Sequence, residues 1–159
     1  MVFRTRVELL KCTSRDTLPP EKTANDAAAW HLQLGDLAAK ITEAFPGAST
    51  SLGGDLGPRS ADALSFEVPL GDGVWLEGLA TTPYPEIGSV MAVQASAAEA
   101  AQFSAWLRGS IVPSPDLVHF TSELALNNGD DAYWVLPPHG SVDEIAQTLQ
   151  QHIDSTDRL

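Results

Sequence analysis

Cysteine is almost absent from this chain of 159 residues, in which Cys12 is the only one. A single thiol cannot form an intramolecular disulfide, which fits a reducing compartment, and we interpret Cys12 as a structural or inert surface thiol. No apolar run approaches the ~20 residues that a transmembrane helix needs. Residues 1–11 alternate charged with apolar side chains and lack the apolar core of a secretory signal. The sequence therefore predicts a cytoplasmic protein.

Positive charge is scarce and unevenly distributed. Residues 1–22 carry five cations and three acids, whereas residues 23–159 carry four cations and eighteen acids, and no lysine follows Lys40. Such a chain repels nucleic acid and anionic membranes, because both are bound chiefly through Lys and Arg. A basic protein partner would instead be attracted and steered. The alternative, that the acidity serves only solubility, stays open.

The familiar sequence signatures of catalysis are missing. No glycine-rich loop has the spacing of a phosphate or dinucleotide site, and no nucleophile elbow is present. The four histidines are scattered without the paired spacing of a zinc helix. The acidic stretch 127–131 lacks the spaced ligands and distal glutamate of a calcium loop, so it is read as a turn. We therefore expect no metal, no cofactor and no catalytic residues.

Periodicity and turn signals predict the first half of the fold. A strand is expected over Phe3–Leu10, mobile loops over 12–25 and 47–62, and between them a helix from near Asn25 to Phe45. Residues 64–70 and 74–80 then alternate around a Gly71-Asp72-Gly73 turn, as in a β-hairpin.

The second half is predicted in the same way. A strand at 87–95 precedes a helix from Ser96 to Gly109, strands near 117–126 and 132–136 follow, and a helix opens at Ser141 before a frayed tail at 154–159. Both helices begin with the serine and glutamate of a capping box. The order β-α-βββ-α-ββ-α predicts a single α+β domain over 1–159, with an antiparallel sheet of five to six strands and three helices packed on it.

A set of apolar positions on these faces is expected to form the core. Its members are Leu34, Leu37, Ile41, Phe66, Val68, Leu76, Val93, Phe103, Leu107, Val135, Ile145 and Leu149. Trp30 and Trp134 also fall on the faces of their elements that are expected to point into the core. Trp106 lies one position off the apolar face that Phe103 and Leu107 form on its helix.

The hairpin register singles out one pair of acids. A turn at 71–73 places Glu67 directly across the ladder from Glu77, where two like charges destabilise each other. Trp75 lies beside them, opposite the predicted core face. The carboxylates either extend into water, or bind a cation from a helix (Arg108 is a candidate) or from a partner, or form a catalytic or metal-binding pair. Glu67, Trp75 and Glu77 are the candidate partner-binding residues.

The order of elements from residue 26 to 153, together with the acidic charge, resembles the type III secretion chaperones. This resemblance implies a cytoplasmic, dimeric protein that binds effector segments in bacteria. The chain is also similar, as a small acidic α+β protein, to the immunity proteins of bacterial toxin systems, which cover the active site of a toxin. Neither resemblance carries a motif.

Our leading expectation is a non-enzymatic, immunity-type inhibitor that masks a basic toxin or enzyme surface. The alternative is a secretion chaperone, for which a homodimer would be expected, and the third is a small enzyme using the carboxylate pair.

Overall fold

The computed structural model describes residues 7–9, 32–53, 63–84 and 87–157. Along the chain its elements are β1 (Val7–Leu9), α1 (Leu34–Ala44), β2 (Ser49–Leu52), β3 (Ala63–Gly71), β4 (Val74–Tyr84), β5 (Ile87–Val93), α2 (Ala97–Ser110), the 3₁₀ helix η3 (Pro115–Leu117), β6 (His119–Ser122), α3 (Glu123–Asn127), β7 (Trp134–Val135) and α4 (Val142–Asp157).

The strands form one sheet in the order β2-β3-β4-β5-β1-β6-β7, and every neighbouring pair is antiparallel. The four strands β2 to β5 form one part, β6 and β7 form a second, and the short β1 joins them. The expected α+β class with an antiparallel sheet is therefore confirmed. The described residues contain seven strands and four α-helices, which corrects the expected five to six strands and three helices.

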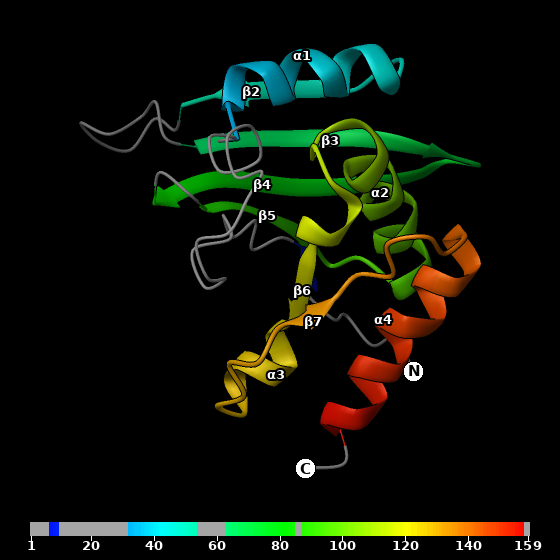
Figure 1. Ribbon diagram of the computed structural model, residues 1–159. Coiled ribbons are helices and arrows are strands. Elements are labelled where there is room, and N and C mark those ends of the chain that lie inside the picture. Colours follow the sequence, from blue (N-terminus) through cyan, green and yellow to red (C-terminus); the bar gives the residue numbers. More distant parts are fainter. Residues whose placement is uncertain (1–6, 10–31, 54–62, 85–86, 158–159) are drawn as a thin grey trace.

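One face of the sheet is packed against helices. Alternate residues of β3 and β4 point into the core, among them Leu64, Phe66 and Leu76. Buried side chains of α1, α2 and α4 join the same core cluster. Helices α2 and α4 pack against each other, and α1 runs along β2 at one edge of the sheet (Figure 1). Because side chains alternate along a strand, the residues between the core positions face the other way.

The β3–β4 hairpin turns at Asp72 and Gly73, whereas the predicted turn also included Gly71, which belongs to the end of β3 and pairs with Val74. Asp72 and Gly73, at the tip, both have positive φ (54° and 74°), as a type I′ turn requires. The ladder pairs Pro69 with Trp75 but Gly71 with Val74, so a bulge precedes the turn.

Farther down the hairpin, Phe66 pairs with Gly78. A Cβ on this glycine would lie 2.2 Å from the Phe66 ring. The ring therefore covers the glycine on the core side.

Two of the helices begin as the sequence predicts. The Ser96 side chain accepts a hydrogen bond from the backbone N–H of Glu99, whose carboxylate accepts one from the Ser96 N–H. Ser141 and Glu144 form the same reciprocal pair at the start of α4. These capping boxes satisfy backbone donors that a helix start would otherwise leave unpaired.

Three predicted boundaries are wrong. The helix predicted from near Asn25 to Phe45 is not continuous, since Leu32 and Gln33 are not helical and α1 begins only at Leu34. The stretch read as a mobile loop over 47–62 contains β2, and the tail predicted to fray from residue 154 remains helical to Asp157. The predicted loop at 12–25, most of the strand at 3–10 and the helical start at 25–31 lie outside the described residues.

The segment predicted as a strand over 117–126 is broken into three elements. It contains the end of η3, then β6, and then α3 from Glu123. The Ser122 hydroxyl accepts a hydrogen bond from the N–H of Ala125, which starts a helix where apolar alternation suggested continued strand.

Most of the predicted core is buried, with two exceptions. Val93 is only half-buried, and Val135 is 51% exposed. The neighbouring Leu136 is buried instead, and its N–H bonds the carbonyl of Val118. Strand β7 is only two residues long, and Trp134 and Leu136 on either side of Val135 are the residues that turn inward. None of the described helices combines the length and apolar character of a membrane span.

Candidate functional site

The outer face of the sheet carries the residues that the hairpin register singled out. Glu67 and Glu77 are paired directly across β3 and β4, which confirms the predicted register. Both are exposed, and they flank the Phe66–Gly78 pair that closes the core on the opposite face. Packing of the Phe66 ring over the glycine thus holds the two carboxylates on the outer surface, side by side.

Strand pairing extends this acid pair into a row of four side chains. Ser49 of β2 pairs with Glu67, and Val93 of β5 pairs with Glu77. The row across the four strands therefore runs from a hydroxyl through two carboxylates to an aliphatic side chain. Residues directly opposite in a ladder have Cβ atoms about 4.5–5.5 Å apart, so neighbours in this row are within reach of one ligand.

The neighbouring row of residues shows the same change from hydroxyl to apolar side chains. Ser51 pairs with Ser65, Ser65 with Leu79, and Leu79 with Met91. The β2–β3 side of the surface is therefore rich in hydroxyl groups, and the β4–β5 side is apolar, with the carboxylates between them.

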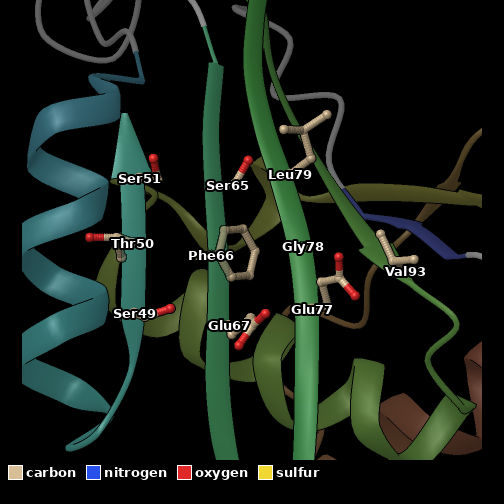
Figure 2. Close-up of a pocket in the computed structure, with 10 residues that line it drawn as sticks. All are labelled: Ser49, Thr50, Ser51, Ser65, Phe66, Glu67, Glu77, Gly78, Leu79 and Val93. Carbon is tan, nitrogen blue, oxygen red and sulfur yellow. The ribbon is translucent and has the colours of Figure 1, made fainter. Parts of the chain in front are cut away.

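These rows line a groove of about 420 Å³ on the sheet surface. Figure 2 shows the carboxylates of Glu67 and Glu77 close to each other, with serine hydroxyls on one side and Leu79 and Val93 on the other. The groove is formed by all four strands β2 to β5, from residues Ser49, Thr50, Ser51, Ser65, Phe66, Glu67, Glu77, Gly78, Leu79 and Val93.

Trp75 lies just beyond the groove on the same face. It occupies the outward position of β4 just before Glu77, is 55% exposed, and pairs with Pro69. Trp106 and Trp134 are half-buried against the core, as expected for Trp134, and Trp30 lies outside the described residues. Trp75 is thus the tryptophan that the structure presents on the outer face.

The cations of the described chain are engaged away from the acid pair. Two of the nine Lys and Arg side chains fall within the described residues, Lys40 and Arg108. The Arg108 guanidinium donates to the carbonyls of Pro137 and Gly140 at 2.6 and 2.8 Å, and Lys40 donates to the carbonyl of Ser110. Arg108 is therefore not the counter-ion of Glu67 and Glu77, which corrects that candidate pairing.

The groups in the groove are suited to binding a cation. They offer carboxylate and hydroxyl acceptors for a cation and an aliphatic wall for its apolar part. Among the described residues, no three His, Cys, Asp or Glu side chains gather as metal ligands. The groove lining contains no histidine, lysine or cysteine beside the carboxylates.

A second polar feature, buried under the sheet, was missed from the sequence. His152 of α4 is 1% exposed, and its Nε2 accepts a hydrogen bond from the Ser122 N–H. Its ring packs edge-on against Phe120 and Trp134. Burial lowers the pKa of His152, and the negative charge of Asp130 opposes this shift in part. The sequence did indicate this burial, because His152 lies at helical spacing from the apolar Ile145 and Leu149, on the same face of α4.

The hydroxyl side of the groove was also missed. Ser49 and Ser51 belong to β2, a segment whose glycine- and serine-rich surroundings predicted a loop. The alternation of Ala48, Thr50 and Leu52 with these serines was the available signal, but it is short.

Comparisons with protein-family models, with curated proteins and with solved structures found no match to this chain.

Proposed function

We propose that this protein is a non-enzymatic binding domain whose outer sheet face, centred on Glu67 and Glu77, captures a basic protein. The observation that carries the proposal is the like-charged pair in the groove, while the two described cations, Lys40 and Arg108, bond backbone carbonyls elsewhere. Two carboxylates facing each other repel, and a partner cation relieves that repulsion.

An immunity-type inhibitor that masks a basic enzyme surface is the form of this function that we favour. A sheet is a rigid platform, and the groove lies on four hydrogen-bonded strands rather than on loops. The net charge of −12 would speed the approach of a basic partner. A homodimer that binds extended effector segments would favour the secretion chaperone instead.

Site-directed photo-crosslinking in the native cell tests this proposal. A photo-reactive amino acid at Ser65, in the groove, is expected to capture a basic protein, whereas the same amino acid at the exposed Gln147 on α4 is not. Equal capture from both positions, or recovery of only nucleic acid or lipid from Ser65, would contradict the proposal.

The captured partner then allows a quantitative test. Replacing both acids (Glu67→Gln with Glu77→Gln) should weaken binding by about 2–5 kcal/mol, because a buried partner cation is left unpaired. The control is Asp131→Asn with Asp154→Asn, which changes the net charge equally at exposed sites away from the groove. We expect the groove variant to melt at the same temperature as the parent, or slightly higher, since it loses a repulsion.

A further inference from the structure

The geometry points to arginine, rather than lysine, as the partner residue that enters the groove, with its guanidinium between Glu67 and Glu77 and one edge against Trp75. This inference rests on the proposed function, since it concerns the same face. It specifies the chemistry of the contact, and it can be tested on the isolated protein.

The acid pair can accept several hydrogen bonds at once. Glu67 and Glu77 project from adjacent strands at directly paired positions, so four carboxylate oxygens lie within one small area (Figure 2). A guanidinium carries five N–H donors in a planar fork, and it can bond two carboxylates at once. An ammonium offers three donors from a single nitrogen, and it satisfies such a pair less completely.

The two walls of the groove differ in polarity. Leu79 and Val93 form the β4–β5 side of the groove, and a ligand head group placed there loses part of its hydration. A guanidinium is hydrated more weakly than an ammonium, so it loses less on entering. On the opposite side, the Ser49 and Ser65 hydroxyls can accept the outward N–H groups.

An exposed tryptophan lies next to the acid pair on the same face. Trp75 precedes Glu77 by two residues, on the same face of β4, and is 55% exposed. A guanidinium stacks on an indole face through both its charge and its planar surface, which an ammonium cannot do in the same way. An arginine bonded to Glu77 is therefore close enough to use Trp75 as a second contact.

The test is an NMR titration of the isotope-labelled full chain with three small probes. These are Nα-acetyl-arginine amide, Nα-acetyl-lysine amide and Nα-acetyl-citrulline amide, the last being nearly the same shape as arginine but uncharged. We expect arginine to shift the Trp75 indole N–H and the Glu67 and Glu77 amides. It should bind about two- to fivefold more tightly than lysine, the ratio that stacking on an exposed aromatic ring supplies. Citrulline should leave these signals unchanged.

Two variants separate the contribution of the two carboxylates to arginine binding from that of the tryptophan. In Glu67→Gln with Glu77→Gln, arginine binding should weaken about tenfold, because both charged acceptors are gone. In Trp75→Leu, arginine should still bind but lose its advantage over lysine. The Asp131→Asn, Asp154→Asn variant serves as the control and should bind arginine as the parent does.

Several outcomes would overturn the inference. Equal binding of lysine and arginine would remove the guanidinium preference, while crosslinking from Ser65 could still succeed and leave the proposed function intact. Arginine-induced shifts that map to other acidic residues, or that persist in the Glu67→Gln, Glu77→Gln variant, would show that the groove is not the arginine site. Failure of the proposed function is a separate result, which is the absence of a basic partner crosslinked from Ser65.

Discussion

The surroundings of His152 favour its neutral form, because burial lowers its pKa. The Nε2 atom accepts from the backbone N–H of Ser122, so the ring proton is on Nδ1, which is buried without a hydrogen-bond partner in the described part of the chain. Protonation would convert Nε2 into a donor facing another donor. It would also place a charge among the rings of Phe120 and Trp134, which the negative charge of Asp130 offsets in part.

A pH dependence of stability follows from this geometry. The pKa of His152 in the folded state is lower than its ordinary value, which is about 6.5 in the unfolded chain. The unfolded state therefore binds the proton first as the pH falls. The free energy of unfolding should be constant with respect to this group above about pH 6.5. Below that pH it should fall by at most ~1.4 kcal/mol per pH unit, until the folded-state pKa is reached.

Urea unfolding at several pH values between 7.5 and 5.5 measures this effect. In His152→Gln the slope below pH 6.5 should become shallower, whereas the exposed His139→Gln should keep the slope of the parent. The comparison uses slopes, since the first variant also loses aromatic packing at every pH. An unchanged slope in His152→Gln would show that other groups cause the acid sensitivity.

At the scale of elements, Arg108 joins α2 to the segment that leads into α4. Its two hydrogen bonds to the carbonyls of Pro137 and Gly140 are partly buried. Arg108→Met keeps the aliphatic stem but leaves both carbonyls without their donor, and it should lower the free energy of unfolding by ~1.5–3 kcal/mol.

Lys40→Met provides the matched control, because Lys40 is the other cation in the described chain and makes an exposed bond of 3.4 Å. It should change stability by less than about 0.5 kcal/mol in urea unfolding. Similar losses in the two variants would mean that removal of positive charge, rather than loss of the carbonyl bonds, destabilises the protein.

At the scale of the whole molecule, the net charge of −12 acts on folding as well as on partners. Repulsion among the acids is stronger in the compact state than in the unfolded chain, and salt screens it. The urea midpoint should therefore rise when sodium chloride is raised from about 20 mM to about 300 mM, a range over which the screening length falls to several ångströms. A midpoint that falls instead would show that ion pairs outweigh the repulsion.

The hairpin and the capped helices could be predicted because their signals are local. The turn residues and the alternation around them set the register of β3 and β4, and hence the positions of Glu67, Glu77 and Trp75. The serine and glutamate of each capping box likewise satisfy each other's backbone within one turn of helix.

Where local signals compete, the prediction failed. The apolar run at 117–126 suits a strand, but β6 ends at Ser122, whose hydroxyl accepts a hydrogen bond from the Ala125 N–H and whose own N–H donates one to His152. His152 lies in α4, thirty residues farther along the chain, so alternation within the run could not reveal its bond to Ser122.

The sequence by itself determined the α+β class, the hairpin register, the acidic charge and the exposed face of the acid pair, because each depends on side-chain alternation or composition. Only the tertiary structure decided which groups surround that pair. β2 pairs with β3 and brings serine hydroxyls to one side, β5 pairs with β4 and brings Val93 to the other, and Arg108 bonds carbonyls elsewhere. The physical reason is that strand neighbours and ion partners far apart in the chain are selected by the packing of the whole core, which no short window of sequence contains.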